Sequence, residues 1–169
     1  MSSHGFHTIA LPDLATTERL AAEIATRARV GEAVLLSGPL GAGKTAFARA
    51  FVRVWLGDPT AEVPSPTFTL VQPYDGPRGP VWHLDLYRLG DPEELLELGI
   101  EQALAEAVVL VEWPDRLGPW VPADRLDLAL AVWQTGIEDA RTARLHGHGA
   151  WRERLADWAH EEGPAYGGC

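Results

Sequence analysis

Two short runs of the chain, residues 33–36 and 108–111, consist only of apolar residues. Each lies between turn-forming or charged residues, which is typical of a strand buried on both faces of a sheet. Other short apolar-rich segments, several of them alternating with polar residues, predict further strands. These segments are residues 8–11, 67–74, 81–85, 126–133 and 141–145, of which the last two can pair as a hairpin.

Apolar residues at helical spacing separate these predicted strands. The expected helices cover about residues 13–29, 44–55, 91–107 and 151–160. Asp13 and Asp91 are suitable N-caps, and Pro92 fits the first turn of the third helical region. Strands that alternate with helices predict an α/β fold, with helices on both faces of a mostly parallel sheet and antiparallel strands at its edge.

The length of 169 residues suits a single domain, with a core at about residues 8–145 and a C-terminal helix and tail at 150–169. No apolar run approaches the roughly 20 residues of a membrane span, the N-terminus lacks the apolar region of a signal peptide, and the one cysteine is Cys169. We therefore expect a cytoplasmic protein. The net charge of −10 argues against direct binding to a nucleic-acid backbone.

Residues 38–45 follow the first apolar run and fit the pattern G-x-x-x-x-G-K-[ST] of a phosphate-binding loop. Lys44 is the only lysine in an arginine-rich chain, so its position favours a compact ammonium group. Backbone N–H groups of Gly41 to Thr45 are expected to surround nucleotide phosphates at the N-terminus of the next helix. Lys44 would reach the β- and γ-phosphates, and the Thr45 hydroxyl would coordinate Mg²⁺. The competing interpretation is a purely structural glycine turn.

Two acids at the ends of predicted strands are candidates for a second metal-binding side chain. Glu112 follows the second apolar run, and Asp85 ends the strand at 81–85. We place Glu112 on the metal and Asp85 on the attacking water or behind the metal, and the reverse assignment stays open. Thr67 has the position of a switch residue that senses the γ-phosphate, or of a hydroxyl cap in a proline turn.

Several other side chains have two interpretations. Arg88 can stabilise charge during phosphoryl transfer, or it can pair with surface acids. Trp113 can stack on a base or a partner, or it can pack in the core. His146, His148 and His160 have no metal-ligand neighbours in the sequence and are expected at the surface, and with a single terminal cysteine no zinc site is indicated.

Four segments in this order resemble the TsaE family, the bacterial ATPase subunit of the machinery that makes threonylcarbamoyladenosine in tRNA. They are Gly-x-Leu-Gly-Ala-Gly-Lys-Thr at 38–45, Ser-Pro-Thr-Phe-Thr-Leu at 65–70, His-Leu-Asp-Leu-Tyr-Arg-Leu at 83–89 and Leu-Val-Glu-Trp-Pro at 110–114. The resemblance covers about residues 8–145. It implies a P-loop NTPase-like three-layer sandwich.

The resemblance implies a role for each residue that matches the family. Asp85, Thr67 and Lys44 are expected to be catalytic, and Thr45 and Glu112 to bind Mg²⁺. The residues expected to contact ATP are Thr17, Gly38, Leu40, Gly41, Ala42, Gly43, Lys44, Thr45, Trp113 and Arg141. The segment at 136–140, just before Arg141, departs from the family spacing.

The resemblance also implies TsaD and TsaB subunits as partners, with tRNA reached through them, and this fits the acidic net charge. ATP is favoured over GTP because the guanine-binding motif Asn-Lys-x-Asp needs a second lysine, which the chain lacks. Two other functions stay open. One is a small-molecule kinase on the same loop, although no arginine-rich lid is evident. The other is a nucleotide-binding interaction module without turnover.

Overall fold

A seven-stranded sheet in the order β1-β7-β6-β2-β5-β4-β3 forms the centre of the computed structural model, which describes residues 6–132, 136 and 140–161. The strands are β1 (Phe6–Leu11), β2 (Ala33–Ser37), β3 (Val71–Gly76), β4 (Gly79–Asp85), β5 (Val108–Glu112), β6 (Arg125–Val132) and β7 (Arg141–His148). The four central strands β6, β2, β5 and β4 are parallel. The outer strands β3, β7 and β1 each run antiparallel to their neighbour, so the predicted mixed sheet is confirmed.

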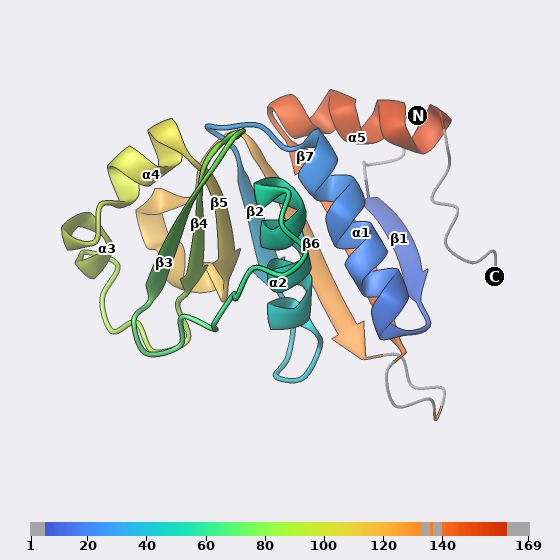
Figure 1. Ribbon diagram of the computed structural model, residues 1–169, viewed down its shortest axis with the longest axis horizontal. Coiled ribbons are helices and arrows are strands. Elements are labelled where there is room, and N and C mark those ends of the chain that lie inside the picture. The colour runs from blue at the N-terminus through green and yellow to red at the C-terminus, as the bar shows by residue number, and fades with distance from the viewer. Residues whose placement is uncertain (1–5, 133–135, 137–139, 162–169) are drawn as a thin grey trace.

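Helices cover both faces of this sheet, as Figure 1 shows for α1 and α2 in front of it and for α3 and α4 beside β3 to β5. The helices are α1 (Leu14–Arg27), α2 (Lys44–Leu56), α3 (Glu94–Glu97), α4 (Ile100–Glu106) and α5 (Ala150–Glu161), with a 3₁₀ helix η1 (Pro114–Trp120). In the part of the chain that the structure describes, no helix combines the length and the apolar composition needed to cross a membrane. Because helices cover both faces of a mixed sheet, the predicted three-layer α/β fold is confirmed.

The apolar runs of β2 and β5 lie where both faces of the sheet are covered. Val34 and Leu36 pack with α1 and α2 in one core, whereas Ala33 and Leu35 pack in a second core with residues of α3, α4 and η1. The strands β6, β7 and β1 instead bury alternate residues only, since in the described part of the chain no helix packs over their second face. The pattern of burial explains why two strands are continuously apolar and three alternate.

The structure corrects several boundaries. The strand expected at 67–74 begins only at Val71, because Leu70 donates a backbone hydrogen bond of 2.8 Å to the Pro66 carbonyl and adopts a left-handed conformation with φ of 66°. The helical region expected at 91–107 is divided at Gly99, whose φ of 90° ends α3. The helix η1 was not predicted. The part of the expected C-terminal tail after residue 161 and the expected end of the strand at Trp133 lie outside the described residues.

Candidate functional site

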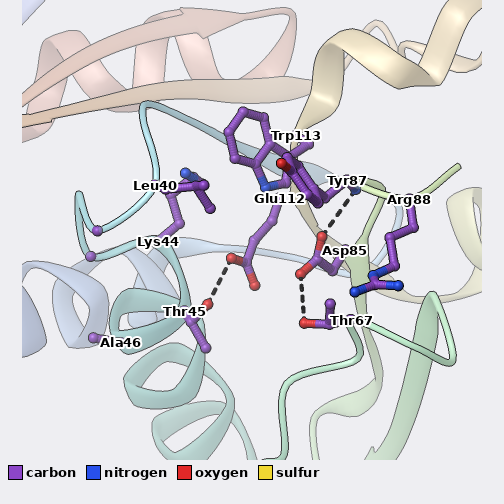
Figure 2. A pocket seen from close by; sticks show the side chains of 12 residues that line it. Leu40, Lys44, Thr45, Ala46, Thr67, Asp85, Tyr87, Arg88, Glu112 and Trp113 are labelled. Carbon is purple, nitrogen blue, oxygen red and sulfur yellow. Dashed lines mark hydrogen bonds between the residues drawn. The ribbon is translucent and has the colours of Figure 1, made fainter.

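A cavity of about 410 Å³ opens at the carboxyl ends of β2, β4 and β5, between α2 and the segment that precedes β3 (Figure 2). Parallel strands direct their last residues to one edge of the sheet, so this edge is the place where such folds bind ligands. The residues that line it are Leu40, Gly41, Gly43, Lys44, Thr45, Ala46, Thr67, Asp85, Tyr87, Arg88, Glu112 and Trp113. Ten of these twelve, all except Ala46 and Tyr87, are residues for which the sequence suggested a functional role.

The loop between β2 and α2 takes its shape from glycines. Gly41 and Gly43 have φ values of 79° and 99°, a region that other residues rarely adopt. A side chain at Gly38 would collide with the carbonyl oxygen of Leu130 on β6. Gly43 is the N-cap of α2 and no side chain caps this helix end. The first N–H groups of α2 are therefore directed at the cavity, which makes this helix end suited to an anion.

Lys44 is 5% exposed and lies folded over its own loop. Its ammonium donates hydrogen bonds to the carbonyls of Gly38 at 2.6 Å and Pro39 at 2.9 Å, and it lies 4.1 Å from the ring centroid of Trp113. Burial lowers the pKa of the Lys44 ammonium, and the nearby carboxylates of Glu112 and Asp85 oppose that shift. A positive charge is thus held at the cavity wall by neutral acceptors.

Glu112 ends β5, is 2% exposed, and has a partner on each carboxylate oxygen. The Thr45 hydroxyl donates to Oε1 at 2.9 Å, and Nε2 of His83 lies 2.7 Å from Oε2. His83 is fully buried, and its Nδ1 has no hydrogen-bond partner. The neutral tautomer with its proton on Nε2 fits both observations, because it donates to Glu112 and leaves no N–H unpaired. The carboxylate is therefore fixed in orientation.

Asp85 ends β4 directly beside Glu112, its partner in the strand register. The backbone N–H of Tyr87 donates to its Oδ1 at 3.1 Å, and the Thr67 hydroxyl donates to its Oδ2 at 3.3 Å. Thr67 shares a second hydrogen bond of 2.8 Å with the hydroxyl of Ser65. Asp85 is thus held more loosely than Glu112, since one of its contacts is long and comes from a loop outside regular secondary structure.

The remaining residues expected to contact ATP lie farther from the cavity. Arg141 is the first residue of β7 and lies opposite Leu11 in the register of β1 and β7. Its guanidinium donates to the carbonyl of Gly41 at 2.9 Å, so it contacts the glycine loop without lining the cavity. Gly38 and Ala42 belong to the loop but do not line the cavity. Thr17 is buried in the first turns of α1 and does not line it either.

His83 was not identified from the sequence as a functional residue, and Tyr87 was given no role. A signal for His83 was present, because it lies two residues before the strand-end acid Asp85 and so points to the same face of the strand. Arg88 lies with its guanidinium 4.6 Å from the ring centroid of Phe68, which is 81% exposed. Of the two interpretations of Arg88, the pairing with surface acids is not seen among the described residues, because the guanidinium lies against Phe68 instead.

Comparison with known proteins identifies the chain's relatives. The sequence model of the family described as "Threonylcarbamoyl adenosine biosynthesis protein TsaE" matches residues 11–142. The tRNA threonylcarbamoyladenosine biosynthesis protein TsaE of Rickettsia bellii is 39% identical over 116 residues, which cover 69% of this chain and 80% of that protein. The protein of the same name from Synechocystis is 40% identical over 120 residues, 67% of this chain and 73% of that one.

A crystal structure of YdiB from Bacillus subtilis is similar with a TM-score of 0.75 over 95% of this chain and 97% of that chain, at 24% identity. At this identity the likeness shows the shared fold alone. The family match, by contrast, covers well over half of the sequence and includes all four segments on which the resemblance was based. The chain therefore belongs to the TsaE family.

Proposed function

We propose that this protein is a Mg²⁺-dependent ATPase that supports partner subunits in making threonylcarbamoyladenosine in tRNA. The observation that carries the ATPase is the contact of 2.9 Å between Thr45 and Glu112 at the end of a glycine loop. A hydroxyl at the helix start and a carboxylate at the neighbouring strand end are the pair of oxygen ligands that Mg²⁺ needs beside a polyphosphate. The family to which the chain belongs supports the biological role.

In this proposal the loop binds the phosphates of ATP. N–H groups from Gly41 to Thr45 donate to phosphate oxygens, and Lys44 exchanges its two carbonyl acceptors for the β- and γ-phosphates. Arg141 holds the carbonyl of Gly41 and so supports the loop from outside the cavity. Trp113 covers the ammonium of Lys44 and offers a flat apolar surface beside the nucleotide. Direct contacts of Thr17, Gly38, Leu40 and Ala42 with ATP stay part of the proposal.

The two acids have different roles in the proposed reaction. Glu112 and Thr45 hold Mg²⁺, which would neutralise charge on the phosphates, and His83 keeps the Glu112 carboxylate oriented. Asp85 lines the same cavity but, unlike Glu112, accepts no hydrogen bond from Thr45. Its position suits a group that orients the attacking water. Thr67 reaches Asp85 from the segment before β3 and can report the state of the phosphates to that segment.

The surroundings of the cavity suit a partner protein. Leu40 and Phe68 are 70% and 81% exposed, and they flank the cavity on the glycine loop and on the segment before β3. Exposed apolar side chains at the rim of a site that binds nucleotide can be covered by a partner. We propose TsaD and TsaB as these partners in the cytoplasm, and a chain with net charge −10 would reach tRNA through them rather than directly.

The test combines the purified chain with TsaD, TsaB, tRNA and ATP and measures repeated tRNA modification together with phosphate release. We expect both to require this chain, and Lys44→Ala to abolish both. Full modification by Lys44→Ala would show that the proposal is wrong. Phosphoryl transfer to a small acceptor without partners would instead favour the kinase, and binding of ATP with no hydrolysis in the assembly would favour the interaction module.

A further inference from the structure

The strands β6, β7 and β1 carry partly exposed side chains on a face of the sheet that no helix within the described residues covers, away from the nucleotide cavity. His146 and His148 lie on this face, two residues apart on β7, so both rings point to the same side. Asp127 of β6 is the register partner of His146 in the antiparallel pair. Three side chains that commonly bind metals therefore meet on one patch of the open face.

The ligand atoms of these three side chains are close together. One atom from each of Asp127, His146 and His148 lies within 4.8 Å of the others, and the two imidazole centroids are 4.2 Å apart. Nε2 of His148 is 2.9 Å from Oδ2 of Asp127. That nitrogen is shielded from solvent, and among the described residues the short contact with Asp127 does not give it a hydrogen-bond partner.

Neighbouring side chains fix the orientation of the ligands. Nε of Arg125 donates to the other carboxylate oxygen of Asp127 at 3.1 Å, and its Nη1 donates to the carbonyl of Pro122 at 2.9 Å. Arg125 therefore directs Oδ2 toward the two histidines. The ring of Phe6 packs on His146 with centroids 4.4 Å apart and limits the movement of that imidazole. Outer contacts of this kind are what a metal site needs to hold its ligands in place.

We propose that Asp127, His146 and His148 form a binding site for one divalent transition-metal ion, with Zn²⁺ as the best-suited ion. Two imidazoles and one carboxylate are a ligand set for Zn²⁺, Co²⁺ or Ni²⁺, whereas Mg²⁺ prefers oxygen ligands alone. Three protein ligands leave a fourth, open position for water or another ligand. The side chains of His148 and Asp127 are 24% and 39% exposed, so an ion can enter from solvent.

The proposed site differs from what the sequence indicated. His146 and His148 have no metal-ligand neighbours in the sequence and were expected at the surface, and no zinc site was indicated. The third ligand comes from a different strand, 19 positions before His146 in the sequence, and only the pairing of β6 with β7 brings it into reach. None of the three residues lines the nucleotide cavity, so the proposed site and the proposed Mg²⁺ site are separate.

The test is calorimetric titration of Zn²⁺ into the full, untagged chain in a buffer with millimolar Mg²⁺. We expect one ion per chain, a melting temperature that rises with Zn²⁺ concentration, and an intense visible spectrum typical of tetrahedral Co²⁺ when Co²⁺ replaces Zn²⁺. Asp127→Asn and His148→Gln should each weaken Zn²⁺ binding at least about tenfold. Two control variants, His160→Gln on α5 and Cys169→Ser, should bind Zn²⁺ as the original chain does.

Circular dichroism of each variant establishes that it is folded before it is titrated. If the chain binds no Zn²⁺ at micromolar concentrations, the proposal is overturned. It is equally overturned if Asp127→Asn and His148→Gln bind normally, or if Cys169→Ser or Glu112→Gln removes the binding instead. Should one substitution prevent folding, the other and His146→Gln still decide the question, because each removes a different ligand.

Discussion

The parallel strands of the sheet begin at one side, here called the amino edge, and finish at the opposite side, the carboxyl edge. These two edges use their charged residues in opposite ways. At the carboxyl edge, Lys44, Asp85 and Glu112 surround an open cavity, and their partners include neutral carbonyls and hydroxyls that a ligand can replace. At the amino edge, the charged residues Glu32 and Arg78 are instead held by partners within the protein. Glu32, just before β2, binds Arg154 of α5 through two hydrogen bonds of 2.6 and 2.7 Å and also accepts the N–H of Arg29.

A second arginine at the amino edge shows the same behaviour. Arg78, in the turn between β3 and β4, donates to the carbonyls of Ala25 at 2.7 Å and Ala28 at 2.9 Å, at the end of α1. Its guanidinium also lies 4.0 Å from the ring centroid of Trp55. These contacts join helix α1 and the side chain of Trp55 on α2 to the turn between β3 and β4. The contacts at the amino edge therefore hold the fold together, whereas the carboxyl edge keeps polar groups available for a ligand.

The strongest test of this comparison is Lys44. We expect both Lys44→Ala and Lys44→Arg to reduce ATP hydrolysis about 10³-fold or more, the arginine because its wide planar fork does not fit the glycine loop. Phosphate release in the presence of partners is the measurement. The unfolding free energy should stay close to that of the original chain, because burial already disfavours the charge on Lys44. The control variant is Arg53→Lys, at the far end of α2, which should hydrolyse ATP normally. Normal hydrolysis by Lys44→Arg would contradict the proposed need for a compact ammonium group.

The amino edge should show the reverse effect. Arg154→Ala leaves the buried carboxylate of Glu32 without its partner and should lower the unfolding free energy by about 3 kcal/mol. Urea denaturation measures this loss. Hydrolysis per folded molecule should not change, because Arg154 does not line the cavity. Arg152→Ala, an exposed position on the same helix, should cost less than about 0.5 kcal/mol. Equal losses from the two variants would refute the difference between the edges.

The roles of Glu112 and Asp85 can be distinguished by the Mg²⁺ dependence of ATP hydrolysis in variants of each residue. Glu112→Gln should raise the Mg²⁺ concentration for half-maximal hydrolysis by about 100-fold, because it removes a direct metal ligand. Asp85→Asn should leave that concentration nearly unchanged and lower the maximal rate instead. Titrations of Mg²⁺ at saturating ATP measure both. If the two results were exchanged, Asp85 would be the direct ligand, the assignment that the sequence left open.

The smallest effect is expected from the buried histidine behind Glu112. His83→Gln should raise the Mg²⁺ requirement about tenfold while ATP affinity without metal stays the same, because His83 acts only through the orientation of Glu112. The same Mg²⁺ titration provides the measurement, and the double variant His83→Gln with Glu112→Gln should be no worse than Glu112→Gln alone. Additive effects in the double variant would mean that His83 acts by a different route.

Much of the fold was predictable because it follows from local patterns. The seven strands, the cap Asp13 and the glycine loop were all read from neighbouring residues, and the structure confirms them with small shifts. Where a prediction was wrong, a long-range or backbone effect was responsible. The turn at Leu70 shortened one strand, and Gly99 divided one helical region. Neither change alters the hydrophobic pattern, so the pattern could not reveal it.

The candidate site was only partly predictable. Lys44, Thr45, Thr67, Asp85 and Glu112 were identified as candidates because each has a distinctive chemistry near a strand end or a loop. Sequence alone could not show which of them touch. Thr45 and Glu112 are 67 positions apart, and Arg141 reaches Gly41 across 100 positions.

Local sequence is enough to predict the strands, most of the helices, the glycine loop and the family, because backbone sterics, hydrophobic periodicity and short motifs act between near neighbours in the chain. Two contacts follow only from the three-dimensional fold: His83 orients Glu112, and Asp127 lies beside His146 and His148. Both arrangements depend on which strands lie side by side, at spacings of about 5 Å. That order is set by the packing of the whole sheet, and no local stretch of sequence contains it.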